Sequence, residues 1–348
     1  AILDKAIELS DAGGYEARKA QSKAKGKIRG RGIGQFLEMT AGVMNELGAI
    51  HFETDGTVTI ATGTHDHGQG HWTPFAQILV DRLGVPFDRI RIKQTDSDQL
   101  SAGGGTGGSK SLMSSGTAIW EASNRVVDKG KEAAAHFLEA SAGDIRFASG
   151  RFSIVGTDRS ISIMDLAGKL AAAGNLPDGV PASLNVDYVH ESAPATYPNG
   201  CHIAEVEIDA ATGDIDVVKY TMVGDFGVMV NPLIVEGQLH GGVVQGIGQC
   251  LMETAVYTED GQLASGSFMD YAMPRAVDIP DFAFHSLPDP ATVNPLGAKG
   301  CGEAGVAGAM TSVMNAIVDA LRPYGVRHVD MPATPEKVWR LMHRKVAA

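Results

Sequence analysis

The sequence predicts an α+β protein built as two lobes, each a mixed or antiparallel sheet with helices on one face. The chain has 348 residues, which is enough for about two domains. Strand pairs are followed by helices, without the strict strand–helix–strand alternation that builds a parallel sheet. Apolar residues make up 44% and charged residues 20%, a balance typical of a globular chain and not of a disordered one.

Turn signals divide the first half into several periodic segments. An amphipathic stretch is interrupted at Gly13-Gly14, and Asp55-Gly56 between two alternating runs indicates a hairpin. A helix should stop at Gly84, because Pro86 cannot continue it. In chain order we expect helices within 1–27, strands within 30–61, a helix at 72–83, a strand at 90–93 and a long helix at 115–140.

A segment rich in Pro, Gly, Asn and Ser, at about 172–200, separates the first half from the second. We therefore place one lobe at 1–185 and the other at 186–348. In the second lobe we expect strands at 202–209 and 214–222, a helix at 232–254, a hairpin near Glu259-Asp260-Gly261, a proline-rich loop at 288–302 and a helix at 304–321.

Charge and cysteine content narrow the class of protein. The net charge is −12, which does not favour a large nucleic-acid surface, and one basic run at 18–31 is expected to dock on an acidic partner. We expect no membrane span, and no leader within the charged residues 1–10. The three cysteines form no CxxC pair, so no zinc ribbon or iron–sulfur cluster is expected in this chain, and a reducing cytoplasm is the expected location.

Three histidines close together in sequence offer a metal-binding interpretation. His65 and His67 would share one face of an extended segment, and His71 follows four residues later. A metal-dependent hydrolase that uses these residues stays open as an alternative. Such an enzyme would need further ligands, and the sequence has no second clear cluster of them.

Glycine is the unusual component, at 43 of 348 residues, and its clusters include three loops that precede helices. These loops are at 68–70, 107–109 and 300–302. The last one begins a GxGxxG pattern, but prolines at 288–295 occupy the place where a dinucleotide fold needs its central strand. Glycine loops at helix N-termini offer backbone N–H groups, which suit a polar ligand carrying phosphates and a heterocycle.

Five separated segments carry a resemblance to a known family. In order they are Gly-Gln69-Gly-His71, Gly107-Gly108-Ser109-Lys110-Ser111, Glu236-Gly-Gln238 through Gly248, Gly266 to Arg275, and Asn294 to Gly305. Together they resemble the molybdopterin-binding large subunit of the xanthine dehydrogenase, aldehyde oxidase and aerobic carbon monoxide dehydrogenase family. The resemblance runs nearly end to end, but it matches only the C-terminal part of that subunit.

The resemblance implies the fold of that family's molybdenum cofactor-binding domain and a site for molybdopterin with molybdenum, in its cytosine dinucleotide form. It implies that the following residues bind the cofactor: Gly68, Gln69, Gly70, Thr106, Gly107, Gly108, Ser109, Asp225, Gln245, Lys299 and Gly302. Glu303 matches the catalytic glutamate, and no side chain is expected to ligate the metal. From the residues alone, Glu303 could also be an acid that stabilises the N-terminus of helix 304–321.

The implied activity is oxidative hydroxylation of a small carbonyl or N-heterocyclic substrate with water, with Glu303 as general base. Electrons would leave through a [2Fe–2S] cluster and FAD on partner chains, an iron–sulfur subunit and a flavin subunit. Another chain or segment would supply the N-terminal half of the large subunit, because this chain offers only half of the pocket. A fragment without cofactor or activity is the remaining alternative.

Overall fold

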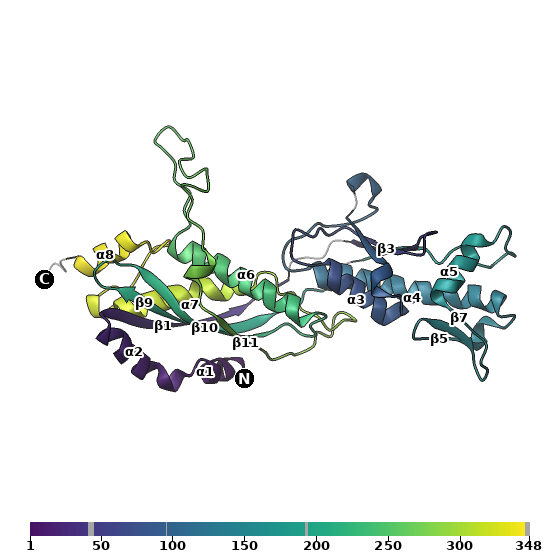
Figure 1. Cartoon of the computed structure of the whole chain (residues 1–348), viewed down its shortest axis with the longest axis horizontal. Coiled ribbons are helices and arrows are strands. Elements are labelled where there is room, and N and C mark those ends of the chain that lie inside the picture. The colour runs from purple at the N-terminus through teal and green to yellow at the C-terminus, as the bar shows by residue number, and fades with distance from the viewer. Residues whose placement is uncertain (41–44, 95, 192–193, 345–348) are drawn as a thin grey trace.

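The computed structural model describes residues 1–40, 45–94, 96–191 and 194–344, whose strands form two four-stranded sheets and one three-stranded sheet. One four-stranded sheet and its helices form a lobe that contains both chain ends, which we call the terminal lobe. The other four-stranded sheet belongs to a lobe made from residues 46–190, which we call the middle lobe (Figure 1). The predicted α+β class with mixed sheets is confirmed.

The sheet of the terminal lobe joins strands from opposite ends of the chain. Its order is β1-β9-β10-β11, with β1/β9 and β9/β10 antiparallel and β10/β11 parallel. The bounds are β1 (Lys27–Leu37), β9 (Asn199–Asp209), β10 (Ile215–Asp225) and β11 (Phe282–Ser286). The predicted boundary at 185/186 therefore does not coincide with the division of strands between sheets, because β1 pairs with β9 and lies outside the lobe expected at 1–185.

Helices cover both faces of this sheet, whereas helices on one face were predicted (Figure 1). Along β9, Ala204 and Val206 face the main core beneath α6 (Pro232–Leu251) and α7 (Ala304–Leu321). Cys201 and Ile203 point the other way and pack on Ala6 of α1 (Ile2–Leu9). The short helix α2 (Tyr15–Ala24) follows α1 and packs beside β1.

The basic run at 18–31 is partly engaged within the chain, whereas Lys23 and Lys25 are exposed, so only these lysines stay available for the predicted docking on a partner. Arg18 Nη2 lies 2.6 Å from Glu205 Oε1, and Arg29 Nε lies 2.8 Å from Glu205 Oε2. Arg29 Nη1 also lies 2.8 Å from Glu207 Oε1. These ion pairs are largely buried, so they tie α2 and β1 to β9 and leave less positive charge for a partner.

The middle lobe has a sheet of order β4-β3-β2-β8, again mixed, with helices packed against it. Its elements are β2 (Glu46–Phe52), β3 (Val58–Thr62), α3 (Trp72–Leu83), β4 (Ile90–Gln94), α4 (Ser111–Phe137) and β8 (Val186–His190). The helix predicted at 72–83 has these bounds, and Gly84 ends it at a φ of 63°, where glycine is favoured.

The sequence prediction omitted a small antiparallel sheet at the far end of the middle lobe. It consists of β5 (Ile145–Ala148), β6 (Arg151–Ile154) and β7 (Ser160–Ser162), and α5 (Ile163–Ala172) follows it. Ser149 and Gly150, both with positive φ, connect β5 to β6, which is the geometry of a tight hairpin turn. This sheet lies far from the site described below (Figure 1).

The segment Ala304–Tyr324 is long and apolar enough to cross a bilayer, although no span was predicted. Most of it is buried in the core of the terminal lobe, between the sheet and α6. Its apolar character is therefore explained by burial on several sides. The last helix, α8 (Pro335–His343), packs Val338 into the same core.

Candidate functional site

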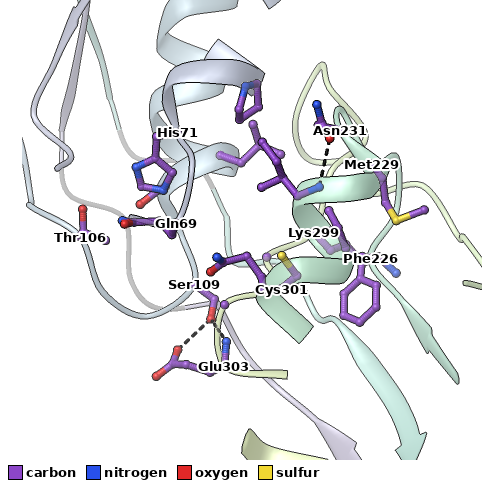
Figure 2. A pocket seen from close by; sticks show the side chains of 18 of the residues that line it. Gln69, His71, Thr106, Ser109, Phe226, Met229, Asn231, Lys299, Cys301 and Glu303 are labelled. Atoms are coloured by element: carbon purple, nitrogen blue, oxygen red, sulfur yellow. Dashed lines mark hydrogen bonds between the residues drawn. The ribbon is translucent and has the colours of Figure 1, made fainter. Parts of the chain in front are cut away.

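A cavity of about 320 Å³ lies where the two lobes meet, and both lobes line it (Figure 2). Asn231 fixes this junction from the start of α6. Its Oδ1 accepts from the N–H of Ile234 at 3.0 Å, which caps the helix, while its Nδ2 donates to Gln77 Oε1 on α3 at 2.9 Å. One side chain thus begins a helix of the terminal lobe and bonds a helix of the middle lobe.

The first wall of the cavity is the turn between β3 and α3, which Asp66 builds. Its carboxylate accepts from the N–H groups of Gly68 at 2.8 Å and Gly70 at 3.2 Å. Burial raises the pKa of Asp66, but these backbone bonds outweigh that effect and leave it below its ordinary value. Within the turn, Gln69 Nε2 donates to His65 O at 2.8 Å, and its Oε1 accepts from the N–H of His67.

The second wall is the glycine loop before α4, which is bonded to the first. Thr106 Oγ1 accepts from the N–H of His65 at 2.8 Å and donates to His65 O at 2.7 Å. Gly105 and Gly108 take positive φ values, and a Cβ built on Gly107 would meet nothing within 4 Å. The loop therefore presents its backbone to open space on the cavity side. Lys110 is buried, and its amino group donates to Gly104 O at 3.3 Å.

Glu303 faces this loop from the terminal lobe, at the residue before α7. Ser109 Oγ donates to Glu303 Oε2 at 2.8 Å and accepts from the N–H of Glu303 at 3.0 Å (Figure 2). Ser109 has a φ of 55°, which a residue other than glycine rarely adopts. The Glu303 carboxylate does not cap its own helix. Its side chain instead bonds Ser109 at the edge of the cavity, while its place before the first turn of α7 also suits an acid that stabilises the helix N-terminus.

Lys299, four residues before Glu303, lines the cavity from the terminal lobe. Its amino group forms a largely buried ion pair with Asp225 Oδ2. Asp225 also accepts from the N–H groups of Gly227 and Asp289, both at 2.9 Å. The carboxylate thus fixes the loop that follows β10 and holds Lys299 in place.

The structure brings together eight of the twelve predicted site residues. Those that line the cavity are Gln69, Thr106, Gly107, Gly108, Ser109, Lys299, Gly302 and Glu303. Gly68 and Gly70 shape the turn around Gln69, and Asp225 lies behind Lys299. Gln245 is exposed on α6 and is not a lining residue.

Gln238, two helical turns before Gln245, lines the cavity instead. Seven residues bring a helix back to nearly the same face, so the two glutamines differ in their position along the axis, by about 10 Å, and not in direction. The sequence motif contained Gln238, but sequence reasoning did not select it. Asn231 is a typical N-cap residue, so the sequence did indicate where this helix begins, and Gln238 lies nearer to that start than Gln245 does.

The three histidines do not gather as a metal site. His65 and His67 are exposed, with ring centroids 6.0 Å apart, whereas His71 turns toward the cavity and packs on Phe75. Within the described residues no group of three His, Cys, Asp or Glu side chains could hold a metal ion. Burial lowers the pKa of His71, and its buried Nδ1 has no hydrogen-bond partner among those residues. A neutral imidazole with an unused polar atom thus faces the cavity wall.

The family model for the molybdopterin cofactor-binding domain matches residues 5–280. The chain belongs to this family, the cofactor-binding domain of the large subunits of xanthine dehydrogenase, aldehyde oxidoreductase and carbon monoxide dehydrogenase.

Two curated relatives and one solved structure illustrate the match. The nicotine 6-hydroxylase large subunit of Paenarthrobacter nicotinovorans is 35% identical over 97% of this chain and 43% of the relative. The carbon monoxide dehydrogenase large chain of Hydrogenophaga pseudoflava is 32% identical over 90% of this chain and 39% of the relative. Quinoline 2-oxidoreductase from Pseudomonas putida 86 superposes with a TM-score of 0.88 at 32% identity, over 99% of this chain and 45% of that one. The chain therefore spans less than half the length of these relatives.

Proposed function

We propose that this chain is the molybdopterin-binding part of a molybdenum hydroxylase, which oxidises a small carbonyl or N-heterocyclic substrate with water. The observation that carries the proposal is Glu303, whose carboxylate meets the glycine loop of the other lobe at the edge of the cavity. The described residues form no three-ligand metal site at the histidines, so they do not favour the hydrolase alternative.

The residues present fit the cofactor. Gly107 leaves room for a ligand against its backbone, and Gln69 and Gln238 offer amide groups to a heterocycle. Lys299 lines the cavity with its amino group paired to Asp225, and the dinucleotide form of the cofactor is proposed from the family resemblance. Release of cytidine monophosphate when the purified cofactor is hydrolysed would test that form. A pterin without nucleotide would contradict it.

When bound, the molybdenum cofactor supplies the two-electron oxidation. The chain's own residues orient the bound group and accept a proton. The glycine loop excludes water from one side of the cavity, while Gln69 and Gln238 orient the group that lies between them. The Glu303 carboxylate, held by Ser109, accepts the proton that water loses as its oxygen is transferred to the substrate.

The test of this role replaces Glu303 with glutamine in the assembled enzyme. Glu303→Gln keeps the shape of the side chain but removes the base, so turnover should fall about 10²- to 10⁴-fold while molybdenum content stays unchanged. Glu132→Gln, at an exposed position of α4, is the matched control and should leave both unchanged. Normal turnover in Glu303→Gln would remove Glu303 from the mechanism.

We further propose that another chain or segment supplies the rest of the large subunit, and that electrons leave through [2Fe–2S] and FAD on partner subunits. An arm between α6 and β11 projects from the terminal lobe (Figure 1). Within this arm Phe268 and Met269 are 88% and 93% exposed. Such large exposed apolar side chains indicate an interface. We assign this arm to the missing part of the large subunit, because the chain spans only 43% of a relative's large subunit.

Replacing Phe268 and Met269 with serine together should weaken that assembly by at least tenfold, measured by size exclusion with mass spectrometry. The control is Val155→Ser, at a 57% exposed position of the middle lobe. A 36.5 kDa monomer that binds cofactor and turns over substrate would contradict the partner proposal. A cytoplasmic location remains a prediction.

A further inference from the structure

Ser109 contacts Glu303 across the junction of the lobes through two hydrogen bonds that share one hydroxyl (Figure 2). Its Oγ accepts from the N–H of Glu303 at 3.0 Å and donates to Glu303 Oε2 at 2.8 Å. A hydroxyl has one proton to donate, and here Glu303 receives it. Because ionised phosphate oxygens accept hydrogen bonds and donate none, this hydroxyl cannot bond a phosphate of the cofactor unless it releases the Glu303 carboxylate.

The backbone of Ser109 is held in a conformation that its residue type disfavours. Its φ is 55°, in the left-handed region that glycine enters without cost. The loop before α7 packs directly on it: a Cβ on Gly300 would lie 2.0 Å from Ser109 O, and one on Gly302 would lie 3.4 Å from Ser109 Oγ. Strained residues persist at functional sites where the surroundings fix them. A serine where glycine would be easier therefore indicates that the hydroxyl is used, and its partner is Glu303.

The Glu303 side chain needs such a partner because it is exposed. Without a contact, a long and flexible side chain at the edge of a cavity would occupy several rotamers. Ser109 holds Oε2, whereas Oε1 accepts no hydrogen bond from the described residues. One carboxylate oxygen is thus anchored, and the other is left open.

We propose that Ser109 is a positioning residue for Glu303 and that its hydroxyl is not a ligand of the cofactor. This role differs from the cofactor contact that the family resemblance implies, and it rests on the proposed function. Ser109 anchors Oε2, so Oε1 is the oxygen that takes the proton from water. The Ser109 hydroxyl keeps its own proton throughout, and no covalent bond of Ser109 changes.

The test replaces Ser109 with glycine in the assembled enzyme. Ser109→Gly removes the hydroxyl and suits the positive φ, so the variant should fold at least as stably as the natural chain. A misplacement of about 1 Å costs a catalytic step up to about 10²-fold, so kcat should fall about 10- to 100-fold. KM should stay within about threefold, because the substrate keeps its own contacts.

The matched control is Ser149→Gly. Ser149 is also a serine with positive φ, at 47°, in the exposed hairpin between β5 and β6. This variant should gain the same release of backbone strain and leave kcat unchanged.

A comparison in two backgrounds separates this inference from the proposed function. Because Ser109 acts through Glu303, adding Ser109→Gly to Glu303→Gln should cause no further fall in kcat. Normal turnover in Glu303→Gln would reject the proposed function. Normal turnover in Ser109→Gly beside a slow Glu303→Gln would reject this inference alone, as would an equal fall caused by Ser109→Gly in both backgrounds.

Cofactor content gives a measurement that does not depend on turnover. The positioning role predicts that Ser109→Gly keeps its full molybdenum and pterin. A hydroxyl that binds the cofactor predicts that both are lost, and such a loss, with both retained in Ser149→Gly, would overturn the inference. If Ser109→Gly does not assemble, Ser109→Ala is measured in its place, and the same two outcomes decide.

Discussion

Two sets of glycines in this molecule serve opposite purposes. In β1, a Cβ on Gly30 would lie 2.1 Å from Ala316 O, and one on Gly32 would lie 2.0 Å from Ser312 O, both on the backbone of α7. In the loops of the cavity, a Cβ on Gly68 or Gly107 would meet nothing within 4 Å. Glycines of the first set are required because the backbone of α7 occupies the place where a side chain would lie. Glycines of the second set border space that no described residue occupies.

The two sets are connected through α7. Because glycines let this helix lie directly on β1, the residue before its first turn, Glu303, is fixed relative to the sheet. Ser109, two residues after the open Gly107, then bonds that carboxylate across the junction of the lobes. The packed set therefore supports the position of Glu303, the base that we propose, and the open set leaves room for the cofactor that we propose there.

The largest expected effect is on the packed set. Gly32→Ala places a methyl group against the backbone of α7 at Ser312 and Ala316, which cannot move without shifting the helix. We expect the free energy of unfolding to fall by about 3 kcal/mol or more. Chemical denaturation measures this change. A loss below about 0.5 kcal/mol, typical of an open surface site, would show that the packed glycines are no more constrained than the open ones.

Acid should weaken the same packed region through His202, whose ring lies against Gly308 of α7 and bonds Tyr220 at 2.7 Å. Burial lowers the pKa of His202 to about 3. The unfolded state, with a pKa near 6.5, binds more protons below that pH. The contribution is thus present above about pH 6.5 and is lost as the pH falls toward 3.

Between pH 7 and pH 5 this loss amounts to about 2 kcal/mol of unfolding free energy for His202 alone. Denaturation at both pH values, in the natural chain and in His202→Gln, isolates it from the other histidines. If His202→Gln shows the same loss between the two pH values, then His202 is not the residue responsible.

The smallest effect on stability is expected in the open set. Gly107 does not take a positive φ and has empty space at its Cβ, so Gly107→Ala should change the unfolding free energy by less than about 0.5 kcal/mol. Molybdenum content should nevertheless fall, because the methyl group enters the volume assigned to the cofactor. Full molybdenum content in a stable variant would show that nothing occupies that space.

Local features of the fold could be predicted from the sequence, and pairings between distant segments could not. The helix at 72–83 and its glycine stop follow from short-range spacing. The pairing of Gly34 with His202 joins residues far apart in the chain, and no window of sequence contains that information. For this reason the predicted lobe boundary at 185/186 does not coincide with the division of strands between the two large sheets.

The site shows the same limit. Gln69, Ser109 and Glu303 were found through motifs, but a motif does not say how far along a helix a cavity extends. Gln245 was therefore selected in place of Gln238.

The central claim, that the open glycines hold a molybdopterin cofactor, is tested most directly by metal and pterin analysis of the complex purified from its native source. We predict about one molybdenum and one pterin for each copy of this chain. Zinc or manganese in place of molybdenum, or a complete complex that contains neither molybdenum nor pterin, would contradict the account.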